Sequence, residues 1–144
     1  MTKTLPFGYV SRVSSLSAAL ALTLLVPLAA AQQTAPKGNE GFKAAVKQAV
    51  DLGPEIEGME GRQLRMRVLT IEPGGHIGIH SHKDRPAVVY FLKGQDTVTF
   101  GDGTVKQFRP GETAFANHGT THWHRNDGKE PVVLLAVDVF HNKK

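Results

Sequence analysis

The stretch HIGIHSHKDRPAVVYFLKG, residues 76–94, sets two histidines one residue apart ahead of a hydrophobic run that ends in glycine. The run AVVYFLK is rich in β-branched and aromatic residues, which favours a buried β-strand. In a strand, residues i and i+2 share a face and lie about 6.6 Å apart along it, so His80 and His82 can converge on one ion. Pro86 and Ala87, which follow this pair, offer no side-chain ligand. The stretch therefore predicts either a metal site that lacks one ligand or a strand in which the histidines only pack.

The segments on both sides of this stretch predict an all-β fold. QLRMRVLTIE alternates apolar with charged residues, DTVTF and TVKQF flank the turn GDGT, and TAFA, THWHRN and VVLLAVDVF follow later. Glycine and aspartate tolerate the positive φ of tight turns, and EPGG is interpreted as a further turn. Seven or eight short strands predict a β-sandwich or small barrel. Only FKAAVKQAVDL, residues 42–52, spaces its apolar residues like one helical face, which predicts a short N-terminal helix.

Residues 1–31 have the pattern of a secretory signal peptide. Lys3 and Arg12 precede the apolar stretch LSAALALTLLVPLAAA, which ends in small residues, so we expect cleavage after Ala31. The alternative is a retained membrane anchor, but a spanning helix needs about 20 strongly apolar residues, and a proline and serines interrupt this stretch. We therefore expect a periplasmic or secreted protein. Residues 32–62 would form a leader that includes the short helix, and residues 63–141 the single domain.

Composition excludes several classes of function. Removing Lys3 and Arg12 with the signal peptide reduces the basic residues from 17 to 15, against 13 acidic ones, so the net charge is +2 with neutral histidines. This balance is too even to indicate a nucleic-acid or membrane-surface partner. The chain has no cysteine, which excludes disulfides, thiolate ligands and a cysteine nucleophile. Any metal ion would have to be bound through nitrogen and oxygen.

Two clusters of histidines, about forty residues apart, carry a family resemblance. His122, just after a turn at Gly119, is the candidate third ligand beside His80 and His82. At these positions the sequence resembles the cupins, small jelly-roll barrels with two linked motifs. The first motif runs Gly, five residues, His-x-His, three or four residues, Glu, six residues, Gly, and here its matches are Gly74, His80, His82 and Gly94, without the glutamate. The second runs Gly, five residues, Pro-x-Gly, two residues, His, three residues, Asn, and its matches are Gly111, Gly119, His122 and Asn126, with Asn117 in place of the proline.

The resemblance implies a divalent transition metal in the barrel mouth, held by His80, His82 and His122. Three neutral imidazoles suffice for an ion and leave a position open for water or substrate. Without a carboxylate the ion keeps its full charge, so we expect a small anionic ligand, with Lys83 and Arg85 adding to the attraction. The ion could be iron, manganese, nickel, copper or zinc, among which the sequence does not choose. The alternative is that the ion was lost with the carboxylate.

Further side chains near the motifs have two interpretations each. His124 and His76 share parity with the ligands, so both are expected to face the interior unless a bulge intervenes. His124 would be a fourth ligand or a hydrogen-bonding neighbour of the ligands. Arg85 would clamp a substrate carboxylate or lie in a solvated turn. Other expectations are that Trp123 lies in the core or a dimer contact, that Asn126 stabilises a turn, and that His118 and His141 are solvated.

Three functions remain open at this point. The resemblance implies a metal-dependent enzyme, such as a dioxygenase-like oxidoreductase or an isomerase acting on a small molecule. The second hypothesis is a protein that binds a metal or a small ligand without reacting it, because only histidine is an evident general acid or base. The third is a metal-free structural barrel. A homodimer is expected from the resemblance alone.

Overall fold

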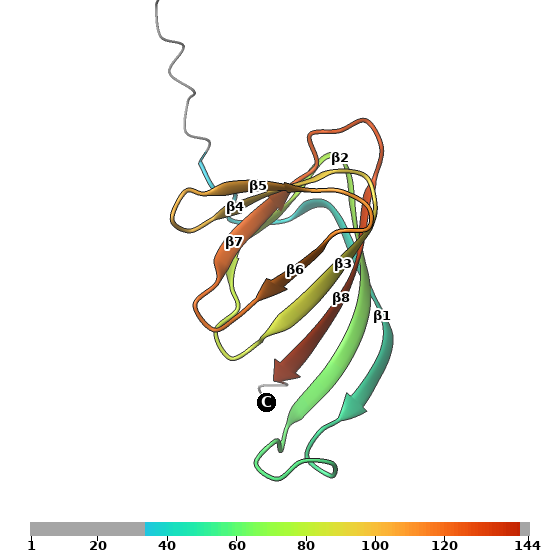
Figure 1. Cartoon of the computed structure of the whole chain (residues 1–144), viewed down its shortest axis with the longest axis vertical. Coiled ribbons are helices and arrows are strands. Elements are labelled where there is room, and N and C mark those ends of the chain that lie inside the picture. The colour runs from blue at the N-terminus through green and yellow to red at the C-terminus, as the bar shows by residue number, and fades with distance from the viewer. Residues whose placement is uncertain (1–33, 142–144) are drawn as a thin grey trace, which may run out of the picture. The chain divides into compact units, whose positions relative to one another are not determined.

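The computed structural model describes residues 34–141, so the predicted signal peptide lies outside the described residues. These residues form eight β-strands and no helix, which confirms the predicted all-β fold (Figure 1). The strands are β1 (Glu40–Asp51), β2 (Arg62–Ser81), β3 (Ala87–Lys93), β4 (Asp96–Phe100), β5 (Val105–Phe108), β6 (Thr113–Ala116), β7 (Thr121–Arg125) and β8 (Val132–His141). Between residues 34 and 141, no helix has the length and hydropathy needed to cross a membrane.

The strands form one sheet that curves into a nearly closed barrel. Their order is β5-β4-β7-β2-β8-β3-β6, and β1 pairs with β2 off this path. The 20 residues of β2 change partner halfway, since residues 62–71 pair with β8 and residues 76–81 pair with β7. The prediction of a turn at EPGG, residues 72–75, is wrong, because the strand continues through it. A shift in register against β1 absorbs the extra residues there, as a bulge does, and turns β2 from one half of the barrel into the other.

The prediction of a helix within residues 42–52 is also wrong. The chain is extended there as β1 and pairs with β2 from Phe42 opposite Ile71 to Asp51 opposite Gln63. The helical spacing of apolar residues creates no buried face, because Val46 is 58% exposed. Pairing outweighs this weak local signal, since the backbone groups along this edge of β2 would otherwise lack partners.

The apolar core fills the space between the two halves of the barrel. Its most buried members include Ile71 of β2, Phe91 of β3 and Leu134 of β8, each at most 1% exposed. Gly94, which follows β3, has a φ of 72°, and a Cβ there would lie 2.7 Å from the carbonyl oxygen of Pro131. Only glycine fits this tight approach, so the closing glycine of the first motif has a structural role.

Candidate metal centre

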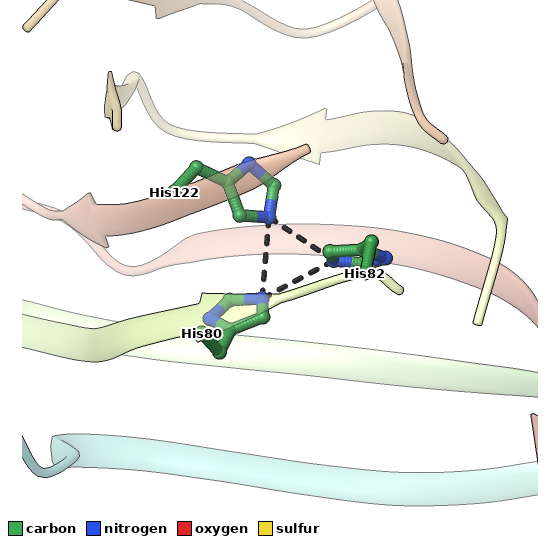
Figure 2. Close-up of side chains that lie close together, drawn as sticks. All are labelled: His80, His82 and His122. Carbon is green, nitrogen blue, oxygen red and sulfur yellow. Dashed lines mark hydrogen bonds between the residues drawn. The ribbon is translucent and has the colours of Figure 1, made fainter. Parts of the chain in front are cut away.

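Three histidine side chains meet where β2 and β7 lie side by side. His80 lies in β2 opposite His122 of β7, and His82 directly follows β2. The Nε2 atoms are 3.2 Å apart for His80–His82, 3.2 Å for His80–His122 and 3.1 Å for His82–His122 (Figure 2). The structure thus brings together the three predicted ligands. This group of side chains could hold a metal ion, and within residues 34–141 it contains no carboxylate.

Backbone carbonyls fix the protonation of two of these rings. The Nδ1 of His80 lies 2.9 Å from the carbonyl oxygen of Gly78, and the Nδ1 of His82 lies 2.9 Å from that of Arg85. A carbonyl oxygen only accepts, so each Nδ1 carries the hydrogen and each Nε2 of the neutral ring carries a lone pair. These lone pairs face each other, and His122 has at most one proton to offer the two of them. A cation at the centre would satisfy all three nitrogens.

The distances between the nitrogens fit such an ion. Bonds of about 2.0–2.1 Å to imidazole place two nitrogens about 3.0 Å apart at octahedral angles and about 3.4 Å apart at tetrahedral angles. The observed 3.1–3.2 Å lies between these values. The donor set is also suitable, because neutral imidazole is a ligand of iron, nickel, copper and zinc.

Burial keeps the three rings neutral. Desolvation lowers the pKa of His80 to about 4, and the hydrogen bond with the Gly78 carbonyl opposes this effect only in part. Desolvation, with repulsion from the neighbouring histidines, lowers the pKa of His122 to about 2. The pKa of His82 is lowered as well, again first by burial. Metal binding requires deprotonated imidazole, and at neutral pH the three rings are in that form.

His124 lies beside the cluster and is not a member of it. Its ring centroid is 4.6 Å from that of His122, and its Nδ1 is 2.7 Å from Oδ2 of Asp96. Both side chains are buried, with His124 7% and Asp96 0% exposed. This arrangement favours the interpretation of His124 as a hydrogen-bonding neighbour of the three histidines over its interpretation as a fourth ligand. Asp96, which was not predicted to belong to the site, is the first residue of β4, whose sequence DTVTF has no feature that indicates a functional residue.

A cavity of about 300 Å³ opens onto the histidines from the barrel interior. His80, His82, His122 and His124 line one part of it, and most of the other lining side chains are apolar. The rings of Phe91 and Phe108 stack within this lining, with centroids 4.8 Å apart. The volume lies at the lower end of the range of small-molecule sites.

The segment before β1, expected to be part of a leader, borders this cavity. Lys37 and Asn39 contribute to its lining. The amide of Ile79 donates a hydrogen bond of 2.8 Å to the carbonyl of Pro36, and the amide of Gly78 donates one of 2.9 Å to Oδ1 of Asn39. The segment is therefore fastened to β2 next to His80.

Arg85 is half-buried and belongs to a cluster around a buried carboxylate. Asp138 of β8 has a fully buried side chain that contacts Arg65, Arg67 and Arg85 at 3.0, 2.8 and 3.5 Å. Arg67 and Arg85 line the cavity. Desolvation lowers the pKa of Arg67, and repulsion from the other two arginines adds to this effect against the attraction of Asp138.

Arg67 and Asp138 were not predicted from the sequence to belong to the site. The signal was present in the alternation of β2, because the apolar residues Leu69 and Ile71 mark the odd-numbered positions as facing inward. Arg65 and Arg67 share that parity, and their side chains are only 14% and 15% exposed. The even-numbered Met66 is instead 39% exposed.

The other predicted residues divide into one correction and several confirmations. His76 was expected to face the interior, but a register shift between Ile77 and His80 reverses the parity, and Ile77 lines the cavity instead. Trp123 is buried, with 4% exposure, and His118 and His141 are exposed, as predicted. Asn126 is fully buried, donates hydrogen bonds to the carbonyls of Ile71 and Glu130, and accepts one from the amide of Gly128.

Comparison with solved structures shows the same fold. The cupin domain of Cnp3 from Schizosaccharomyces pombe has a TM-score of 0.55 and 18% identity, over 69% of this chain and 65% of that one. An uncharacterized double-stranded β-helix protein from Klebsiella pneumoniae has a TM-score of 0.58 and 21% identity, over 76% and 86%. The polyketide cyclase RemF from Streptomyces resistomycificus has a TM-score of 0.59 and 17% identity, over 75% and 72%.

At these identities the structural likeness shows the fold alone. No curated protein matches the sequence. The family model described as "Cupin domain" matches residues 67–138, which is half of the 144 residues and includes the three clustered histidines. The chain therefore belongs to the cupin family.

Proposed function

We propose that this chain is an exported cupin that binds one divalent transition metal ion through His80, His82 and His122 and presents it to a small anionic molecule. The observation that carries the proposal is the convergence of three Nε2 atoms within 3.1–3.2 Å, two of them with lone pairs fixed by backbone carbonyls. Without a cation, this arrangement buries acceptors that face one another, which costs about 1–3 kcal/mol for each unsatisfied group.

The chain's own residues would divide the remaining work. A bound ion supplies an electrophilic centre with positions left for a ligand. The hydrogen bonds from the Nδ1 atoms of His80 and His82 orient the two rings, and the pair of His124 and Asp96 supports the side of the site next to His122. The aromatic lining excludes water from the ligand. Arg85 contributes positive charge at the cavity wall.

Two kinds of activity fit this site. An oxygenase or isomerase would use the ion's open positions on a bound substrate, as the resemblance to the family implies. A protein that only binds its ligand is the second candidate, and one observation favours it. Among the described residues, no carboxylate, hydroxyl or thiol side chain lines the cavity, so His124 and Lys37 are the remaining candidates for proton transfer.

Elemental analysis of untagged protein tests metal binding. We expect about one transition metal ion per chain, and loss of the ion in His80→Ala and His122→Ala. His118→Ala is the matched control, because it removes a histidine whose side chain is 73% exposed and lies outside the cluster. Untagged wild-type protein that carries no ion and takes up none of the five candidate metals would refute the proposal.

Calorimetry and product analysis then separate the two activities. Metal-loaded protein would be mixed with small carboxylates, thiols and phenols in the presence of oxygen. Oxygen uptake or a changed mass of the recovered compound would support an enzyme. Tight binding with unchanged compound would support a binding protein.

A further inference from the structure

We infer that the cavity takes a small carboxylate with an apolar body, and that Arg67 together with Arg85 binds the carboxylate group. The inference rests on the proposed function in one respect, because it assumes that the other end of this ligand lies next to the three histidines. The residue that defines this second recognition point is Arg67, which lies in the first half of β2, on the opposite side of the EPGG segment from His80.

The charges around Asp138 do not balance. Three guanidinium groups surround this one carboxylate, and no carboxylate lines the cavity in the described part of the chain. Arg65 engages both oxygens of Asp138, from Nε at 3.1 Å and Nη2 at 3.0 Å, and its guanidinium also lies 3.8 Å from the centre of the Phe140 ring. Arg65 and Asp138 therefore neutralise each other, and the positive charge in excess lies on Arg67 and Arg85.

The two arginines with excess charge are those that reach the cavity. Arg67 and Arg85 line it, whereas Arg65 does not. Arg67 donates one hydrogen bond, from Nη2 to Asp138 at 2.8 Å, and its Nε is buried without a hydrogen-bond partner. The hydrogen bonds within the chain therefore leave the guanidinium of Arg67 with donors that have no protein partner. A guanidinium fork matches a carboxylate with two parallel hydrogen bonds, which makes a carboxylate the fitting partner.

The remainder of the cavity selects the body of the ligand. Beyond the histidines and arginines, the lining includes Leu69, Ile77, Val98, Leu134 and the stacked pair of Phe91 and Phe108. A polar body such as a sugar would leave its hydroxyl groups without partners against this surface. An aryl or alkyl carboxylate places its charge at the arginines and its apolar part against the side chains of the core.

Titration of phenylacetate and of neutral phenylacetamide tests the inference. Calorimetry would use both zinc-loaded protein and protein stripped with a chelator, because zinc alone also attracts a carboxylate. We expect wild-type protein to bind phenylacetate at least about tenfold more tightly than phenylacetamide in both forms. Arg67→Gln should lose most of this preference, and Arg67→Lys should keep part of it. Arg65→Gln is the matched control, which removes the same charge from the same cluster outside the cavity and should lose much less of the preference than Arg67→Gln.

Three outcomes would overturn the inference. In the first, the preference for phenylacetate survives Arg67→Gln in the zinc-loaded form and is absent from the stripped form, which would mean that the ion binds the carboxylate. In the second, Arg67→Gln and Arg65→Gln lose the preference equally, which would mean that the preference depends on net charge alone. No binding of phenylacetate to either form of the wild-type protein rejects the ligand class. A failure of zinc binding would contradict the proposed function and not this inference, because the stripped form still tests the role of Arg67. If Arg67→Gln does not fold, Arg67→Lys replaces it, and its expected result is a partial loss of the preference.

Discussion

Acidification separates this buried site from an ordinary cluster of surface histidines. Three imidazoles with the usual pKa near 6.5 would be about nine-tenths protonated at pH 5.5, so a metal ion would displace about 2.7 protons on binding. Here the pKa values of His80 and His122 are lowered to about 4 and about 2, so both rings remain unprotonated at pH 5.5. Only His82, whose pKa is lowered as well, can contribute, and its contribution is less than one proton.

The same values set the dependence of metal affinity on pH. Between pH 7 and pH 5, each ordinary histidine would weaken binding by about 25-fold, and three together by about 10⁴-fold. In this site the whole loss should stay below about 25-fold, since one ring at most begins to titrate in this interval. The metal-bound form should therefore persist in mildly acidic solution.

Calorimetric titration of zinc into chelator-stripped protein at about pH 5.5, in buffers with different enthalpies of ionisation, counts the protons released. We expect fewer than one proton per ion. Release of two or more would mean that the rings are protonated before the ion binds, which would refute the assignment of a buried, preformed site. The same titration of His118→Ala should give the wild-type count, because that ring lies outside the cluster.

Three further predictions concern the barrel that supports the site. In metal-free protein the free energy of unfolding should fall as the pH drops from about 6.5 towards 4, because only the unfolded chain then protonates His80 and His122, and thermal unfolding at several pH values would show the slope. Asn126→Asp should cost at least about 3 kcal/mol in urea unfolding, because a buried carboxylate would then face two carbonyl oxygens, and a cost below about 1 kcal/mol would contradict this role. Gly78→Ala should release the segment at Gly38 and raise its hydrogen exchange, because the added Cβ would lie 2.6 Å from the Gly38 oxygen, whereas unchanged protection would count against this contact.

The clustering of the three predicted ligands could be predicted from the sequence because it depends on local geometry and on a motif. His80 and His82 share a face at any extended segment, and the second motif supplied His122 and the turn-stabilising Asn126. The missing glutamate was equally visible, and the structure puts no carboxylate among the three rings. These features depend on few residues, each close in sequence to its partner or marked by a motif.

Features that depend on pairing between distant strands were missed. The segment of residues 42–52 has helical spacing, and only the free edge of β2 makes it a strand. EPGG has the composition of a turn, and its role as the point where β2 changes partner follows from β7 and β8. His76 was assigned to the interior because it shares parity with His80. A register shift between Ile77 and His80 reverses this parity, and no residue type in the segment indicates the shift.

Arg67 shows why a hydrophobic pattern alone can misassign the faces of a strand. In QLRMRVLTIE the apolar residues Leu64 and Met66 suggest that the even-numbered positions face inward. Leu69 and Ile71 lie on the opposite face of the strand, and these two more buried residues belong to the core. The arginines therefore point inward, where Asp138 completes the alternation of β8 with a charge. The buried carboxylate on β8 holds these arginines, and one of them, Arg67, brings positive charge to the cavity wall. One strand, β2, thus carries both a proposed metal ligand, His80, and Arg67, which we propose binds the carboxylate of the same small molecule, so the bend at residues 72–75 sets the distance between the two.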